Sequence, residues 1–174
     1  MIEKAKKIKM IILDVDGTLT DGKIYIDSNH LEIKAFNVKD GFAVSSAVSL
    51  GMHFAIITGR RSKIVEKRAE ELGVRFVYQK IKNKKAKLKE LLEESGISLD
   101  ETAYIGDDIN DLPAMKMVGL KGATFDSAQE VKEIADFISN AKGGDGAVRE
   151  FVEFILRAQD KWQDVIERFE FRLN

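Results

Sequence analysis

The sequence contains no cysteine and a single proline, Pro113. The lack of cysteine excludes disulfides, thiolate catalysis and cysteine-ligated zinc sites. No apolar run is long enough to cross a membrane, and the apolar stretch near the amino terminus meets Asp14 too early for a signal peptide. Neither sign of charge is in excess, because 29 acidic residues oppose 28 basic ones. This balance argues against a nucleic-acid surface, and we expect a cytoplasmic protein with neither a nucleic-acid nor a membrane partner.

The remaining composition is that of an ordinary globular domain. The chain has 174 residues, of which 44% are hydrophobic and 33% are charged, values typical of one soluble domain. No internal repeat, low-complexity stretch or long linker divides it. We therefore expect a single domain over residues 1–174, with its last helix and tail over about residues 146–174.

Short apolar runs alternate with amphipathic stretches along most of the chain. The runs predict buried strands at residues 8–15, 53–58, 74–78, 102–105, 123–125 and 136–138. The amphipathic stretches predict helices at residues 42–50, 62–72, 85–95 and 128–134, and helices starting near residues 112 and 146. Asp40 is the predicted amino-terminal cap of the first of these helices. Strands that alternate with helices imply right-handed crossovers, and so a three-layer, Rossmann-like α/β fold with a parallel sheet.

One segment interrupts this alternation directly after the first strand. Between residues 22 and 37, apolar and polar residues alternate on both sides of the turn sequence Asp27-Ser28-Asn29. A period of two around turn-forming residues predicts a β-hairpin inserted into the fold.

The first predicted strand ends in two carboxylates, Asp14 and Asp16. Residues two apart in an extended chain point the same way, so both project from the carboxyl end of a buried strand, where open α/β sheets place their ligands. Paired carboxylates raise each other's pKa unless a cation neutralises them. Hard oxygen ligands without nearby histidine or cysteine favour Mg²⁺.

A second acidic cluster, with Asp107, Asp108 and Asp111, follows the strand predicted at residues 102–105. If that strand lies beside the first, both clusters meet at one edge of the sheet. Either cluster alone could be a solvated turn or a helix cap. Together, each at the end of a buried strand, they predict a metal site.

Two further positions suit the binding of a phosphate. Thr58 and Gly59 close the second strand, where a hydroxyl and backbone N–H groups can hold a phosphate oxygen; a plain helix cap is the alternative. Lysines crowd residues 80–89 and most must face solvent. Lys84, near a helix start, is the best placed to neutralise a phosphate.

In their order along the chain, these motifs resemble those of the haloacid dehalogenase superfamily of aspartate-nucleophile phosphatases. Within it, longer stretches resemble the 3-deoxy-D-manno-octulosonate 8-phosphate phosphatases, which act in making the inner core sugar of lipopolysaccharide. These stretches are residues 14–22, 34–41, 57–60 and 143–150, and the similarity runs to about Gln159. Asp145 departs from the basic residue expected in the last stretch.

The resemblance implies a role for each residue of the site. Asp14 is the nucleophile that forms an aspartyl-phosphate, and Asp16 is the acid and then the base. Asp14, the Asp16 carbonyl and Asp107 hold the Mg²⁺ cofactor. Thr58, Gly59 and Lys84 bind the phosphate, while Asp108 and Asp111 orient the metal waters and Lys84.

Two arginines are candidates for binding the sugar. The guanidinium fork of Arg60 matches a carboxylate bidentately, so we expect it to bind the acid group of the substrate. The resemblance places Arg68 near the site of a neighbouring subunit, whereas its position on a helix also fits an ordinary solvated face.

Members of this superfamily insert cap domains at two places, and in this sequence neither place is long enough for a cap domain. The first contains only the hairpin, and the second, residues 59–83, is filled by one helix and one strand. We therefore expect a capless core with an open site. An isolated hairpin is marginally stable in water and its edges can pair with another chain, so we expect a homotetramer joined by hairpins; the alternative is a monomer whose hairpin folds back on its own core.

Two other functions remain open at this point. A phosphatase of a nine-carbon ulosonate phosphate belongs to the same class, although Arg60 favours the octulosonate branch. A non-catalytic scaffold related to sugar-activating enzymes is also conceivable. The intact set of Asp14, Asp16, Lys84 and Asp107 opposes it.

Overall fold

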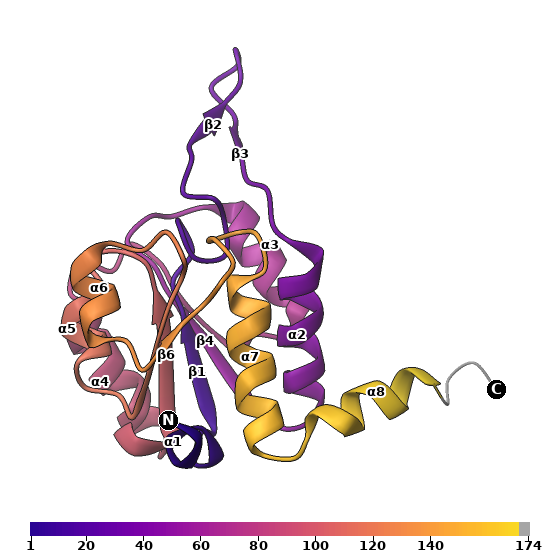
Figure 1. The fold of residues 1–174 in the computed structure, drawn as a ribbon. Coiled ribbons are helices and arrows are strands. Elements are labelled where there is room, and N and C mark those ends of the chain that lie inside the picture. The colour runs from indigo at the N-terminus through magenta and orange to yellow at the C-terminus, as the bar shows by residue number, and fades with distance from the viewer. Residues whose placement is uncertain (171–174) are drawn as a thin grey trace.

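A six-stranded parallel sheet forms the centre of the computed structural model, which describes residues 1–170 (Figure 1). The strand order is β5-β4-β1-β6-β7-β8. The strands are β1 (Met10–Leu13), β4 (His53–Ile57), β5 (Phe76–Tyr78), β6 (Thr102–Gly106), β7 (Leu120–Ala123) and β8 (Phe137–Ile138). The predicted parallel α/β sheet is confirmed.

Helices cover both faces of this sheet (Figure 1). On one face lie α1 (Ile2–Lys6), α2 (Val38–Ser49), α3 (Lys63–Leu72), α7 (Ala147–Ala158) and the start of α8 (Trp162–Glu170); on the other lie α4 (Lys84–Ser95), α5 (Leu112–Met115) and α6 (Gln129–Ile134). Strand β1 is buried on both sides: Ile11 and Leu13 pack in the first layer, while Met10 and Ile12 pack in the second. Near-continuous apolar strands of this kind are what a doubly covered parallel sheet requires.

The register of the central strands sets the position of the site. Leu13 of β1 is paired with Ile56 of β4 on one side and with Ile105 of β6 on the other. The three strands therefore end at the same edge, and the residues that follow them are brought together.

The predicted hairpin is present and projects away from the body of the molecule (Figure 1). It pairs β2 (Tyr25–Ile26) with β3 (Glu32–Ile33) in antiparallel fashion. The carboxylate of Asp27 fixes the turn by accepting hydrogen bonds from the N–H groups of Asn29 and Leu31, at 2.9 and 2.8 Å. Within the described residues this small hairpin is the insertion after β1, and the core carries no large cap domain.

The predicted cap of α2 is wrong. Helix α2 begins at Val38, and its cap is Asn37, whose side chain accepts from the N–H of Lys39 at 2.8 Å. Asp40 is buried inside the helix and accepts instead from the N–H groups of Gly146 and Arg149 at the start of α7, at 3.3 and 2.7 Å. Asp40 is thus a cap of α7 supplied from α2, which a local sequence pattern does not reveal.

Three other elements differ from the sequence prediction. Strand β7 ends at Ala123, where the predicted strand began. Helix α1 was not predicted, because its five residues show no helical period of apolar side chains. The carboxy-terminal helix is broken into α7 and α8, with Asp160 between them at φ 58°. No helix in residues 1–170 is both long and apolar enough to span a membrane.

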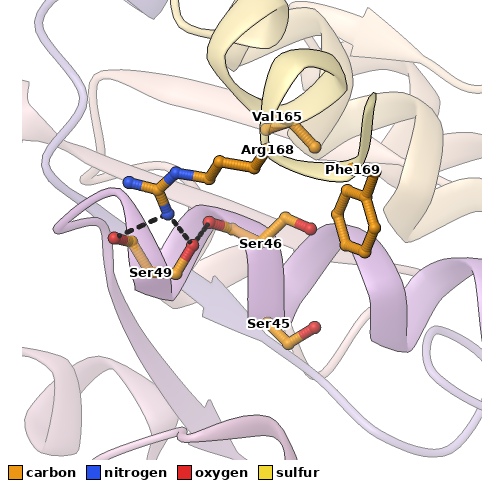
Figure 2. A pocket seen from close by; sticks show the side chains of 6 residues that line it. All are labelled: Ser45, Ser46, Ser49, Val165, Arg168 and Phe169. Atoms are coloured by element: carbon orange, nitrogen blue, oxygen red, sulfur yellow. Dashed lines mark hydrogen bonds between the residues drawn. The ribbon is translucent and has the colours of Figure 1, made fainter. Parts of the chain in front are cut away.

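Helix α8 begins against α7, where Arg149 lies over the ring of Trp162, and reaches α2 further along, where the rings of Phe169 and Phe42 lie 5.1 Å apart. Arg168 donates to the backbone carbonyl and the hydroxyl of Ser49, at 3.2 and 2.6 Å (Figure 2). A pocket lined by Ser45, Ser46, Ser49, Val165, Arg168 and Phe169 lies between the two helices (Figure 2). None of the candidate site residues lines it.

Candidate active site

The two acidic clusters meet where β1 and β6 end. Asp14 directly follows β1 and Asp107 directly follows β6. One carboxylate oxygen from each of Asp14, Asp107 and Asp111 lies within 4.8 Å of the others. The sequence analysis left open whether these two strands are neighbours; β1 and β6 are paired, and this adjacency produces the carboxylate cluster.

Lys84 lies inside this cluster as its buried cation. Its Nζ donates to Oδ1 of Asp14 at 2.7 Å and to Oδ1 of Asp111 at 2.6 Å. Lys84 is the first residue of α4 and is only 4% exposed. The helix start is fixed by Asn83, whose side chain accepts from the N–H of Ala86 at 3.0 Å.

Asp111 holds Lys84 and is itself fully bonded. Its Oδ1 also accepts from the hydroxyl of buried Tyr104 at 2.8 Å, and its Oδ2 accepts from the N–H of Asp107 at 3.2 Å. Both oxygens are therefore occupied by protein donors. Asp111 orients Lys84, and the remaining cluster oxygens belong to Asp14 and Asp107.

The cluster carries more negative charge than Lys84 offsets. Burial and the charge of Asp111 raise the pKa of Asp14 to about 6, and burial with the charges of Asp14 and Asp111 raises the pKa of Asp107 to about 8. Burial would lower the pKa of Lys84, but the two neighbouring carboxylates outweigh it and raise that pKa, so Lys84 stays charged. A second cation fits this imbalance, and carboxylate oxygens suit Mg²⁺.

The loop after β1 leaves one side of Asp107 open for that cation. Oδ1 of Asp107 accepts from the hydroxyl of Thr18 at 3.1 Å, whereas no hydrogen bond from the described residues reaches its Oδ2. Gly17, at φ +97°, lets the loop approach: a Cβ there would lie 2.0 Å from Oδ2 of Asp107. Only glycine fits at this point of the motif.

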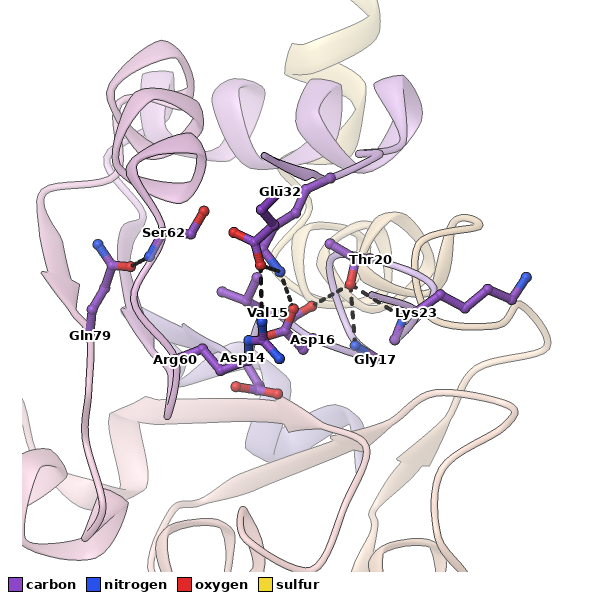
Figure 3. A network of polar contacts seen from close by, with 12 residues as sticks. Asp14, Val15, Asp16, Gly17, Thr20, Lys23, Glu32, Arg60, Ser62 and Gln79 are labelled. Atoms are coloured by element: carbon purple, nitrogen blue, oxygen red, sulfur yellow. Dashed lines mark hydrogen bonds and ion pairs between the residues drawn. The ribbon is translucent and has the colours of Figure 1, made fainter. Parts of the chain in front are cut away.

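Asp16 lies in a separate group of charges at the base of the hairpin. Its Oδ1 accepts from Nζ of Lys34, and Nε of Arg60 lies 3.9 Å from its Oδ2. Glu32 closes the group, because its Oε1 lies 3.2 Å from Nη2 of Arg60 and 3.4 Å from Nζ of Lys34. We call these four residues, two acids and two bases, the charge ring. Figure 3 shows Asp16, Glu32 and Arg60 facing one another between the loop after β1, the hairpin and the loop after β4.

Glu32 and Lys34 were missed by the sequence analysis. Lys34 starts one of the stretches that carry the family resemblance, residues 34–41. Nothing in the alternating pattern of the hairpin distinguishes it from a solvated lysine. Its contact with Asp16 depends on how the hairpin leaves the core.

Thr58 lies at the end of β4, beside the cluster's sheet edge. Both of its backbone polar groups are hydrogen-bonded within the fold. The N–H donates to the carbonyl of Tyr78 at 2.9 Å, and the carbonyl accepts from the N–H of Ile81 at 3.0 Å. The side chain is nearly buried, at 2% exposure of the residue, and its hydroxyl has no hydrogen-bond partner in residues 1–170. Gly59 follows it in an exposed turn.

Two more predicted residues, besides Thr58 and Gly59, lie outside the carboxylate cluster and the charge ring. Asp108 is exposed, and its carboxylate accepts from the N–H of Ile109 at 2.8 Å. Arg68 on α3 pairs with Glu71 at 3.2 Å, and its guanidinium lies 5.8 Å from the centre of the Phe36 ring. The structure assigns Arg68 no contact with the cluster in its own chain.

The glycine-rich stretch before α7 packs against the loop after β1. The N–H of Gly144 donates to the carbonyl of Thr18 at 3.0 Å. A Cβ at Gly143 would lie 1.8 Å from the carbonyl oxygen of Gly17. This stretch therefore supports the loop that carries Asp16, while Asp145 itself is exposed.

Comparison with known proteins agrees with this geometry. Residues 74–151 match the family model of the haloacid dehalogenase-like hydrolases. The chain is 44% identical over 161 residues to the 3-deoxy-D-manno-octulosonate 8-phosphate phosphatase KdsC of Escherichia coli K12, which covers 92% of this chain and 86% of that protein.

Solved structures give the same result. The phosphatase of that name from Yersinia pestis superposes with a TM-score of 0.91 at 42% identity, covering 93% of this chain and 88% of that chain. The one from Moraxella catarrhalis, solved with magnesium, phosphate and KDO, superposes with a TM-score of 0.94 at 40% identity over 97% of both chains. The chain therefore belongs to the haloacid dehalogenase-like hydrolases and, within them, to the 3-deoxy-D-manno-octulosonate 8-phosphate phosphatase family.

Proposed function

We propose that the chain acts as one phosphatase domain that hydrolyses 3-deoxy-D-manno-octulosonate 8-phosphate to the free sugar acid and phosphate, for lipopolysaccharide biosynthesis. The observation that carries the proposal is buried Asp14, in contact with Lys84 and beside Asp107 at the edge of the sheet. The family membership, which extends over 92% of the chain, supports the choice of substrate.

The arrangement suits a two-step transfer of the phosphoryl group. An oxygen of Asp14 attacks phosphorus, the bond from phosphorus to the sugar oxygen breaks, and Asp16 gives that oxygen a proton. Asp16 then takes a proton from water, whose oxygen attacks phosphorus and releases Asp14 and inorganic phosphate. Lys84, with the hydroxyl of Thr58 and the turn at Gly59, binds the transferring oxygens, where charge stabilisation lowers the barrier most.

Asp14, the carbonyl of Asp16 and Asp107 would hold a Mg²⁺ ion. The open Oδ2 of Asp107 and the raised pKa of both carboxyl groups fit this assignment. The ion, when bound, supplies the positive charge that offsets repulsion between the nucleophile and the phosphate. Asp111 acts on Lys84, and Asp108 would orient water at the rim of the site.

A turnover screen tests the proposal. Purified protein is assayed with Mg²⁺, and with EDTA as the control, on the octulosonate 8-phosphate, a nine-carbon ulosonate 9-phosphate and 4-nitrophenyl phosphate. We expect the highest kcat/KM for the octulosonate ester and no turnover in EDTA. A preference for the nine-carbon ester would make that ester, rather than the octulosonate 8-phosphate, the substrate. No turnover of any ester would favour a non-catalytic scaffold.

We also propose that the protein is a homotetramer joined by its hairpins, with the helix of Arg68 approaching the site of a neighbour. The hairpin exposes four large aliphatic side chains, two on each of its faces, more than a solvated ribbon needs. These are Ile24 at 56%, Ile26 at 62%, Leu31 at 62% and Ile33 at 55% exposure.

Light scattering after size-exclusion chromatography tests the assembly. We expect a tetramer mass for the wild type and a smaller species for Ile26→Glu. Ile138→Glu, at an exposed isoleucine outside the hairpin, is the matched control and should leave the mass unchanged. A fully active wild-type monomer would overturn the proposal.

A further inference from the structure

The carboxylate of Asp16 is held by the hairpin. In the part of the chain that the structure describes, its only hydrogen bond comes from Nζ of Lys34, and the next donor, Nε of Arg60, is 3.9 Å away. By contrast, Asp111 accepts from Lys84, Tyr104 and the N–H of Asp107. The acid of the proposed reaction is therefore fixed by fewer hydrogen bonds than Asp111, and its one donor comes from the hairpin rather than from the core.

The side chain of Lys34 is buried although the hairpin around it is exposed. That side chain is 4% exposed, while the residue as a whole, backbone included, is only half-buried. The preceding residue, Ile33, is 55% exposed. Lysine is almost never buried unless its charge is paired. The partners here are Asp16 and Glu32, which lies 3.4 Å from Nζ. The pairing with these two carboxylates offsets the cost of burying the charge of Lys34.

We propose that Lys34 is a positioning residue for Asp16, and that the hairpin takes part in catalysis through it. This inference rests on the proposed function, because Asp16 must act on the oxygen that leaves phosphorus. A general acid has to lie within hydrogen-bond reach of that oxygen. A charge-assisted hydrogen bond selects one orientation of the Asp16 carboxyl, and Glu32 holds Lys34 and Arg60 on the other side. The hairpin thereby sets where the proton is delivered.

The leaving group provides the test. Phenyl phosphate and 4-nitrophenyl phosphate present the same phosphoryl group. Phenolate is the more basic leaving group, so its departure depends more on protonation by Asp16 than that of 4-nitrophenolate does. Lys34→Met keeps the unbranched chain as far as its fourth atom and removes the charged donor. We expect kcat for phenyl phosphate to fall about 10- to 100-fold, kcat for 4-nitrophenyl phosphate to fall much less, and KM to change little. An equal loss with both esters would overturn the positioning role.

Lys23 supplies the matched control. It lies in the other limb of the hairpin, 71% exposed, with Asp21 3.4 Å away. Lys23→Met should leave both rates within about two-fold, as is usual for an exposed charge. A loss as large as that of Lys34→Met would show that any charge removed from the hairpin has this effect, and would overturn the inference.

Combining variants isolates the contact with Asp16. If Lys34 acts through Asp16, the loss that Lys34→Met causes with phenyl phosphate should not recur in an Asp16→Asn background; additive losses with that ester would overturn the inference. If circular dichroism shows that Lys34→Met does not fold, the same two esters are assayed with Lys34→Arg instead. Arginine keeps the charge but shifts the donor, so a partial loss confined to phenyl phosphate is expected, and unchanged rates would overturn the role.

The outcome is separable from that of the proposed substrate. Neither aryl ester contains a sugar acid. A wild-type protein that hydrolyses both esters but rejects the octulosonate 8-phosphate would overturn the proposed substrate and still decide the role of Lys34.

Discussion

The carboxylate cluster and the charge ring are built in opposite ways, although Asp14 and Asp16 are only two residues apart. Asp14, Lys84 and Asp111 are each at most 4% exposed. They lie at the ends of core elements, and Asp111 is bonded on both oxygens. In the charge ring, the side chain of Arg60 is 47% exposed, and the hairpin supplies two of the four members.

This difference separates two tasks of the site. The cluster holds charges that burial makes costly, so its geometry must be fixed by the core. The ring includes the half-exposed Arg60 and is held by a hairpin that projects from the body of the molecule. We infer that the chemistry at phosphorus depends on the cluster, while handling of the leaving group and of the sugar depends on the ring.

The largest effect is expected from Asp14→Asn in the cluster. Removal of the nucleophile should lower turnover of every ester by about 10⁴-fold or more. Stability should not fall, because burial and Asp111 already raise the pKa of the Asp14 carboxyl and make its charge unfavourable. Steady-state kinetics and thermal unfolding measure both, with Asp164→Asn on α8 as a control. Appreciable turnover by the folded variant would show that Asp14 is not the nucleophile.

A smaller and selective effect is expected from Asp16→Asn in the ring. Loss of the acid should cost about 10² to 10⁴ in kcat for esters with poor leaving groups. The loss should be least for 4-nitrophenyl phosphate, whose leaving group needs no proton. Equal losses across a series of aryl phosphates would erase the proposed division of tasks.

Removing Mg²⁺ should affect the cluster in a pH-dependent way. The metal-free native state keeps protons on Asp14 and Asp107 up to pKa values of about 6 and about 8, whereas both would ionise near 3.8 in the unfolded chain. The native state thus binds more protons in this interval, and the free energy of unfolding should fall as pH rises through it.

Mg²⁺ should reverse that loss, since it binds the ionised carboxylates. At about 100 times its Kd it should add about 2.7 kcal/mol, with the largest gain near the upper end of the interval. Thermal unfolding in EDTA and in Mg²⁺ at several pH values measures this. An equal gain at every pH would contradict the assignment of the metal to Asp14 and Asp107.

The smallest effect is expected from Arg60→Ala. Loss of one charged hydrogen-bonding group is worth about 1.5 to 3 kcal/mol, so KM for the octulosonate 8-phosphate should rise about 10- to 150-fold. KM for 4-nitrophenyl phosphate, which has no carboxylate, should change little. Arg61→Ala, at the exposed neighbour, is the control. A uniform rise with both substrates would make Arg60 a general phosphate or structural residue.

Much of the cluster was predictable because it follows from local sequence. Apolar, β-branched runs must be buried on both faces, and a parallel sheet brings their carboxyl ends to one edge. The positions of Asp14 and Asp107 follow from that rule alone. Lys84 was identified through its order among the motifs, and the structure places it in contact with Asp14.

Little of the ring was predictable in the same way. Lys34 is one of many lysines, and its separation of 18 residues from Asp16 carries no periodic signal. Arg60 was identified, but its contact with Glu32 spans 28 residues and depends on the angle at which the hairpin leaves the core.

The sequence by itself therefore determined the sheet, the hairpin and the acids at the strand ends, since each depends on neighbours within a few residues. Tertiary structure alone decided that Asp40 caps α7 across 109 residues, that Asp111 is saturated by Lys84, Tyr104 and backbone, and that Lys34 reaches Asp16. The physical reason is common to all three. A buried charge takes whichever partner the packed elements bring within hydrogen-bond distance, and that partner is chosen by packing rather than by spacing along the chain.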